Sequence, residues 1–198
     1  TISNNRYSGI LLSSSSNNAL TDNKFLSNHT GIQLSSSSSN TLTGNNVSSN
    51  SYGIYLSSSG NNSLIGNNAS NNTYGISLDR SNNNILTGNN SLSNTYGISL
   101  SSSSYNTLSS NTMSGNIYNF NLYSGQVEEM LDVHFDNNID TSNLVDGKPI
   151  YYIRNASDQT YDATTNAGVF YCISCDNVAV DGLRQPGSSP APAAPPSW

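Results

Sequence analysis

The chain has 198 residues, of which 34% are hydrophobic and 9% are charged, so it can bury one sizeable core but offers few ionic contacts. Its formal net charge of −6 excludes the basic face that a nucleic-acid partner requires. No stretch approaches the roughly 20 apolar residues of a membrane span, and we expect neither a cofactor nor a membrane span in this chain.

The first 123 residues repeat with a period of 22. The motif Gly-Ile-x-Leu occupies residues 9–12, 31–34, 53–56, 75–78 and 97–100, with a worn copy at 119–122. The motif Asn-x-Leu keeps a constant phase at residues 18–20, 40–42, 62–64, 84–86 and 106–108. Asparagine also recurs at 23, 45, 67, 89 and 111, and at 28, 50, 72, 94 and 116. Agreement of four registers without an insertion excludes chance.

Each repeat contains three short β-type segments, the third marked by Phe25, Val47, Ala69, Ser91 and Met113. The Ser, Asn and Gly between them favour turns over helix, whereas a leucine-rich repeat places several Leu on one strand. We therefore predict an all-β fold, a right-handed single-stranded parallel β-helix (β-solenoid) with 22-residue coils and an irregular insert near its C-terminal end. Strand alternation puts Ile54 and Leu56 inside and Gly53 and Tyr55 outside. Because like residues stack on like, the asparagine columns should form amide ladders at the turns.

The repeat resembles a known family. Residues 72–78 (Asn-Thr-Tyr-Gly-Ile-Ser-Leu) followed by 84–90 (Asn-Ile-Leu-Thr-Gly-Asn-Asn) look like the NosD-like family of parallel β-helix repeats, also described as carbohydrate-binding and sugar-hydrolase domains and abundant in archaeal surface proteins. The resemblance extends from Thr1 to about Leu183. Residues 138–153 look like a segment that interrupts the helix in archaeal members, and residues 167–183 look like a coil that resumes afterwards.

Composition divides the chain into four segments. Regular coils span 1–123, an acidic, hairpin-like insert spans 124–165, a resumed coil spans 166–184, and a Pro/Ala-rich linker or tail spans 185–198. Residues 126–137 form either a short helix or an irregular excursion. Asp146-Gly147 is expected to turn between residues 143–145 and 149–153. We expect the insert to cap or widen the solenoid, and the tail, if ordered, to be held by a partner surface such as a neighbouring subunit.

Catalytic carboxylates are scarce in the repeats. Enzymes that cleave polysaccharides use paired carboxylates, but residues 1–123 contain only Asp22 and Asp79, at different phases of the coil. The alternative is a site in the insert, built from Glu128, Glu129, Asp132, Asp136 or Asp140 with His134, which otherwise form an acidic surface. Their spacing does not match a calcium loop. We predict no catalytic residues, no metal site and no enzyme.

The resemblance to NosD implies copper delivery as a function to be considered. Copper favours Cys, His and Met, and the chain contains only Cys172, Cys175, His29, His134, Met113 and Met130. The two histidines form no local ligand motif, so we do not expect this chain to share the copper-related activity.

Two further sets of residues are candidates for contacts or cross-links. Tyr52, Tyr74, Tyr96 and Tyr118 form one column, which either contacts glycans or another subunit or simply stacks to stabilise neighbouring coils. Cys172 and Cys175 either form a disulfide across a turn or remain two thiols, because a straight strand would hold their Cα atoms too far apart for a bridge.

The setting of the protein is expected to be extracellular, at the cell surface. Candidate glycosylation sites begin at Asn28, Asn46, Asn61, Asn68, Asn71, Asn89 and Asn155. The chain opens within the repeat pattern at Thr1, and we expect it to be a mature or excised piece of a longer precursor.

The function predicted from these features is structural: a building block of a cell envelope, sheath, filament or adhesin that associates with itself or with other surface proteins. The alternative is a carbohydrate-binding or polysaccharide-processing module that binds glycans. An ice-binding face is not expected on the column of residues 11, 33, 55, 77 and 99, because these residues are too unlike one another.

Overall fold

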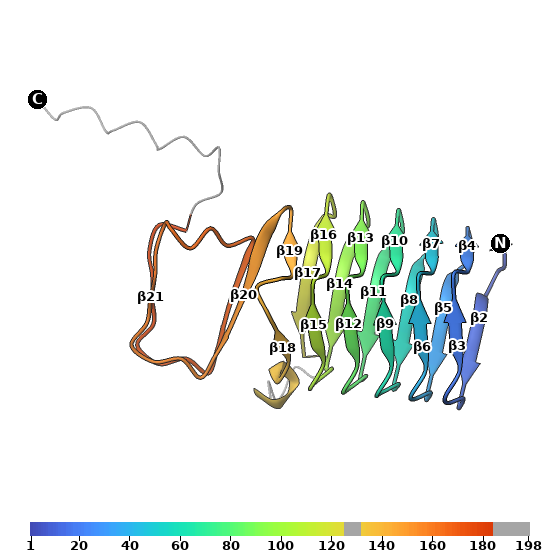
Figure 1. Cartoon of the computed structure of the whole chain (residues 1–198), viewed down its shortest axis with the longest axis horizontal. Coiled ribbons are helices and arrows are strands. Elements are labelled where there is room, and N and C mark those ends of the chain that lie inside the picture. The colour runs from blue at the N-terminus through green and yellow to red at the C-terminus, as the bar shows by residue number, and fades with distance from the viewer. Residues whose placement is uncertain (125–131, 184–198) are drawn as a thin grey trace, which may run out of the picture.

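The computed structural model describes residues 1–124 and 132–183, and it confirms the parallel β-helix (Figure 1). Three parallel sheets run along a rod. Sheet A contains β1 (Ile2–Ser3), β4 (Lys24–Leu26), β7 (Asn46–Ser48), β10 (Asn68–Ser70), β13 (Asn90–Leu92), β16 (Thr112–Ser114) and β19 (Leu144–Val145). Sheet B contains β2 (Ser8–Ser13), β5 (Thr30–Ser35), β8 (Tyr52–Ser57), β11 (Tyr74–Asp79), β14 (Tyr96–Ser101) and β17 (Tyr118–Tyr123). Sheet C contains β3 (Ala19–Thr21), β6 (Thr41–Thr43), β9 (Ser63–Ile65), β12 (Ile85–Thr87), β15 (Thr107–Ser109) and β18 (Asn138–Ile139).

The core is a set of columns, one residue per coil. Ile54 lies between Ile32 and Ile76, and Leu56 between Leu34 and Leu78, and all of these side chains are buried. Each inward position therefore meets its own copy in the next coil, about 4.8 Å away along the rod. The narrow core explains why a chain with so few hydrophobic residues folds.

The turns are held by asparagine ladders, as predicted. The Oδ1 of Asn62 accepts hydrogen bonds from the backbone and side-chain nitrogens of Asn40, at 2.9 and 3.1 Å. The Nδ2 of Asn62 donates to Asn84 Oδ1 at 3.1 Å and to the carbonyl of Ser37 at 3.0 Å. Each buried amide thus satisfies the backbone of a neighbouring turn.

The predicted outward orientation of Gly53 is wrong. Gly53 is buried, and a Cβ added to it would lie 2.5 Å from the carbonyl oxygen of Gly75 and 3.1 Å from Cγ2 of Val47 in the core. The strand register passes from Tyr52 to Ile54 without a paired Gly53. The backbone bends at this point, so simple alternation fails for one residue.

Two strands of the predicted insert continue the rod. β18 pairs with β15 in sheet C, and β19 pairs with β16 in sheet A. The predicted hairpin is confirmed, because β19 pairs antiparallel with β20 (Lys148–Arg154) across Asp146 and Gly147, whose φ angles are +47° and +79°. A short 3₁₀-helix, η1 (Asp132–Phe135), precedes β18; residues 125–131 lie outside the described part of the chain.

Beyond the hairpin the chain forms shorter coils. β20 pairs in parallel with β22 (Val169–Ile173), and β21 (Thr160–Tyr161) pairs with β23 (Ala179–Val180). Figure 1 shows these coils as an open loop beyond one end of the rod. Tyr152, Val169 and Tyr171 pack against the rod's core, so this unit covers its end. The four segments predicted from composition remain a prediction, and the tail 185–198 lies outside the described residues. Among the described residues no helix is long or apolar enough to span a membrane.

Candidate functional site

The tyrosine column forms a stack of parallel rings, which we call the tyrosine ladder. Ring centroids are 4.8 Å apart between Tyr52 and Tyr74, 4.7 Å between Tyr74 and Tyr96, and 5.0 Å between Tyr96 and Tyr118, with interplanar angles of 6°, 8° and 18°. The parallel register of β8, β11, β14 and β17 imposes this spacing. This geometry fits stacking between neighbouring coils, while a contact with glycans or another subunit stays a prediction.

Stacking decides which parts of the rings a ligand can reach. Both faces of Tyr74 and Tyr96 are covered by neighbouring rings, so a sugar cannot stack on them. Tyr118 ends the ladder and is 54% exposed. Within residues 1–124 and 132–183 none of the four hydroxyls makes a hydrogen bond. Burial, followed by the neighbouring tyrosines, raises the pKa of Tyr52 and of Tyr74. The ladder therefore presents mainly ring edges and hydroxyls to a ligand.

A shallow, largely open groove of about 750 Å³ runs along the rod beside the ladder. We call it the polar groove, and its lining comes from the turns between sheets A and B: Ser27, Asn28, Ser49, Asn50, Ser51, Asn71, Asn72, Thr73, Ser93, Asn94, Thr95, Gly115 and Ile117. Ser51, Thr73 and Thr95 directly precede ladder tyrosines. Not one lining side chain is charged. The lining residues Asn50, Asn72 and Asn94 are buried and their amides are engaged in the ladders, so the groove mainly offers repeated hydroxyl groups.

The charged side chains lie outside this lining, although Asp146 Oδ1 accepts a hydrogen bond from the backbone N–H of the lining residue Gly115 at 3.0 Å. Asp79 pairs with Arg80 at 2.9 Å, and Asp136 pairs with Arg154. His134 Nδ1 lies 2.9 Å from Ser124 Oγ. Of the carboxylates proposed for an insert site, Glu128 and Glu129 lie outside the described residues. Asp140 accepts hydrogen bonds from Ser142, its neighbour in the turn before β19. No group of three His, Cys, Asp or Glu in the described ranges is placed to hold a metal ion.

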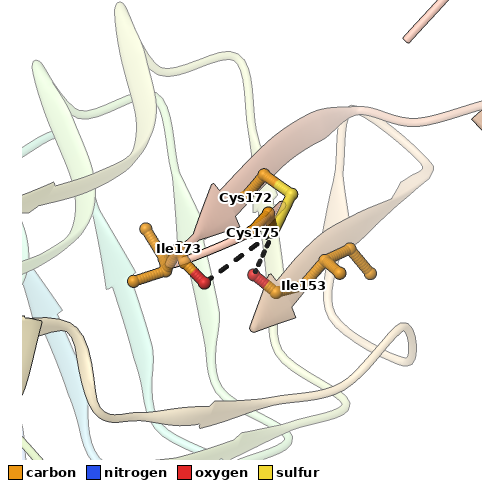
Figure 2. Close-up of a disulfide and its surroundings, with 4 residues drawn as sticks. All are labelled: Ile153, Cys172, Ile173 and Cys175. Atoms are coloured by element: carbon orange, nitrogen blue, oxygen red, sulfur yellow. Dashed lines mark hydrogen bonds between the residues drawn. A yellow bond between two sulfur atoms is a disulfide. The ribbon is translucent and has the colours of Figure 1, made fainter. Parts of the chain in front are cut away.

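Cys172 and Cys175 form a disulfide, with their Cα atoms 5.8 Å apart (Figure 2). Ser174, with a φ of +52°, turns the chain between them. Cys175 Sγ lies 3.7 Å from the carbonyl oxygen of Ile173 and 4.0 Å from that of Ile153. A bridged sulfur carries no proton, so these are packing contacts, and the bridge fixes the turn after β22 rather than forming a reactive site.

The sequons differ in accessibility. Asn28 and Asn89 are buried, and their side-chain amides are hydrogen-bonded: that of Asn28 to Asn5 and the carbonyl of Ile2, and that of Asn89 to Asn111 and the carbonyl of Leu64. Asn46, Asn61, Asn71 and Asn155 are exposed, and Asn68 is half-buried. Their glycosylation stays a prediction.

Sequence reasoning missed two ladder members and the groove. Asn137 and Asn143 accept hydrogen bonds from Asn106 and Asn111, at sequence separations of 31 and 32 instead of 22. The available signal was an asparagine two residues before an apolar residue, Ile139 or Val145, but the preceding insertion shifted it out of the 22-residue phase. The groove had no signal, because its Ser, Thr and Asn look like any turn residues.

Comparison with known proteins gives fold-level similarities. No curated protein sequence matches the chain. One match is a crystal structure of the periplasmic alginate epimerase AlgG, at 14% sequence identity and a TM-score of 0.41. The match covers 88% of this chain and 40% of the AlgG chain. A second match is a structure of an AlgG double mutant, at 16% sequence identity and a TM-score of 0.42. It covers 87% of this chain and 48% of the mutant AlgG chain. This chain thus spans less than half the length of either.

These comparisons correct one prediction. The prediction that the chain is not an enzyme is contradicted, because both similar structures are of an enzyme, and we withdraw it. Similarity at this level assigns no activity to the chain. The family model for the right-handed β-helix region matches residues 1–140. The chain therefore belongs to the family of right-handed β-helix proteins.

Proposed function

We propose that this chain is a carbohydrate-binding β-helix module that holds an uncharged, linear glycan along the polar groove. The observation that carries the proposal is the groove itself, which repeats a hydroxyl group over consecutive coils at Ser51, Thr73 and Thr95. Hydroxyl groups both donate and accept hydrogen bonds, as the hydroxyls of a sugar chain require.

The linear form of the ligand is supported by the repeat. Thr73 and Thr95 occupy equivalent positions of adjacent coils, and such positions are about 4.8 Å apart along the rod. This distance is close to the length of one sugar ring in an extended chain, so successive sugars meet equivalent partners.

Electrostatics supports an uncharged ligand. The groove has no charged lining residue, and the chain carries a net charge of −6. An anionic polysaccharide would meet repulsion without a compensating cation. Alginate, the substrate named for AlgG, is therefore a poorer candidate than a neutral glycan.

The tyrosine ladder contributes an edge to the site. Two of its tyrosines directly follow the groove residues Thr73 and Thr95 in the sequence. The outer ring face of Tyr118, at the end of the ladder, is the surface on which a sugar could stack. In this proposal the ladder keeps the groove straight and donates hydrogen bonds, while sugar stacking is confined to Tyr118.

Affinity electrophoresis of the full chain through gels containing neutral or anionic polysaccharides tests the proposal. We expect retardation by at least one neutral polysaccharide, and weaker retardation when Thr73→Val and Thr95→Val remove two groove hydroxyls. The matched control is Thr41→Val with Thr107→Val, which removes two hydroxyls on sheet C. Binding confined to anionic polysaccharides, or equal loss in both pairs of variants, would contradict the proposal.

A second candidate is the structural role, as a stiff surface building block. The continuous asparagine ladders and strand registers support rigidity, and the disulfide supports export to an oxidising compartment. Membership of the NosD-like group and a cell-surface location belong to this proposal. Electron microscopy of the purified chain tests it: ordered polymers are expected, and dispersed monomers at high concentration would oppose it.

A further inference from the structure

Sheet C presents a face that neither proposal uses. The inward residues of its strands are leucines: Leu42, Leu64, Leu86 and Leu108 are buried. The outward residues of β3, β6, β9, β12 and β15 form two ranks, which we call the threonine face: Ala19, Thr41, Ser63, Ile85 and Thr107 in one, and Thr21, Thr43, Ile65, Thr87 and Ser109 in the other. Seven of these ten residues are Thr or Ile, and none is charged.

This face carries two exposed isoleucines. Ile65 is 42% exposed and Ile85 is 47% exposed, on a rod whose inward aliphatic side chains are almost all covered. On sheet A the corresponding outward positions hold mainly Asn and Ser. Exposed β-branched residues are not needed for the turns or the core. Their methyl groups point to a ligand that contacts apolar atoms and hydroxyls together.

The positions of these side chains repeat in two directions. Strand register aligns Thr43 with Thr21 and Ile65, and Thr87 with Ile65 and Ser109 in the parallel sheet. Rows are therefore about 4.8 Å apart along the rod, and the two ranks about 6.6 Å apart along each strand. Thr87 Oγ1 and Ser109 Oγ lie 3.2 Å apart, so neighbouring hydroxyls are held in order. Figure 1 shows β6, β9, β12 and β15 side by side along the rod.

The chemistry of the face narrows its ligand. Small molecules bind in concave sites, but the threonine face is made of strand residues that project from a continuous sheet. Protein partners usually anchor on Trp, Tyr or Arg, and none of the ten residues is one of these. An ionic ligand would meet no charge. The face is a periodic, uncharged array of hydroxyl and methyl groups. Such an array fits a ligand that is itself a lattice, repeating in two dimensions over similar distances.

We infer that the threonine face binds ice. The hydroxyls of Thr43 and Thr87 can take positions in the hydrogen-bonded lattice of water, because each donates and accepts. The methyl groups between them, with Ile65 and Ile85, order the water that they contact. The oxygen positions of ordinary ice repeat along its prism plane over distances of similar length to the two spacings of the face.

Thermal hysteresis of the full chain, measured with growing ice crystals in a nanolitre osmometer, tests the inference. The wild-type chain should separate the freezing and melting temperatures and produce faceted crystals. Thr43→Tyr and Thr87→Tyr place bulky rings in the centre of the array and should abolish most of that gap. Ser48→Tyr and Ser70→Tyr, on the outward side of sheet A, are matched controls and should retain it.

Circular dichroism melting of all four variants checks that each is folded. The absence of hysteresis in the wild-type chain would overturn the inference, as would equal losses in the sheet A and sheet C variants. The Thr73→Val and Thr95→Val pair should keep its ice activity, because the polar groove is formed by turns outside sheet C. Failure of glycan binding and failure of ice binding are thereby distinguishable.

Discussion

The side-chain oxygen of Asn67 accepts hydrogen bonds from both nitrogens of Asn45, 22 residues earlier, at 3.0 Å from the backbone and 2.9 Å from the side chain. Its Nδ2 donates to the carbonyl of Leu42 at 2.9 Å and to Asn89 at 3.0 Å. One fully buried amide therefore joins three coils.

Replacing this amide should be costly. Asn67→Ala leaves several buried polar groups without partners, at about 1–3 kcal/mol each, so we expect a loss of about 3 kcal/mol or more in the free energy of unfolding. The neighbouring Asn68 provides the control, because its buried Oδ1 has no hydrogen-bond partner in the described structure. Asn68→Ala should change stability by less than about 0.5 kcal/mol. Urea unfolding measures both, and similar effects would contradict the ladder's role.

The bend at the start of the sheet B strands predicts that two Gly→Ala substitutions differ in their effect on stability. A Cβ on Gly75 would lie 2.7 Å from the carbonyl oxygen of Gly97, and no side-chain rotation relieves a clash with backbone. Gly75→Ala should destabilise the chain by about 3 kcal/mol. Gly66→Ala meets nothing within 4 Å but has a φ of +60°, so it should cost only about 1 kcal/mol. Thermal melting distinguishes them, and a reversed order would refute the bend.

The tyrosine ladder can be tested separately for stacking and for binding. Tyr74→Ala removes two stacked pairs, each worth about 0.5–1.5 kcal/mol, and should destabilise the rod by about 2 kcal/mol. Tyr74→Phe keeps both pairs and should leave stability within about 0.5 kcal/mol, while weakening glycan binding if the hydroxyl contributes. The measurements are urea unfolding and affinity electrophoresis on the same samples. Equal stability of the two variants would show that stacking contributes little.

Alkaline pH should weaken the contact between the rod and the shorter coils. Burial raises the pKa of Tyr152 to about 12, and the Tyr152 hydroxyl donates to the carbonyl of Phe135. Above about pH 10 the unfolded chain loses this proton first, so the unfolded state binds fewer protons and stability falls as pH rises toward 12. Burial also raises the pKa of Tyr171, which adds to the same trend.

Tyr152→Phe isolates the contribution of this hydroxyl. The variant should show a shallower loss of stability between pH 10 and about 12 in urea titrations, although its stability at pH 8 should be lower because the hydrogen bond to Phe135 is gone. Identical pH slopes in the two proteins would assign the alkaline loss to other groups.

The sequence alone determined the coil, the three strands per coil, the core columns and the asparagine ladders. These features depend on one relation, a 22-residue spacing that brings each residue onto its own copy, and periodicity in sequence translates directly into periodicity along the rod. The hairpin at Asp146 and Gly147 was likewise predictable, because its turn chemistry is local.

The tertiary structure decided everything that breaks or combines the repeats. Asn137 and Asn143 rejoin the ladders only because β18 and β19 pair with β15 and β16 after the insertion that follows β17. Gly53 turns inward because the backbone bends, and the ring faces of Tyr74 and Tyr96 are covered because neighbouring strands hold them parallel. The polar groove and the threonine face arise from residues of different coils, whose joint shape and exposure depend on three-dimensional packing rather than on the order of residues along the chain.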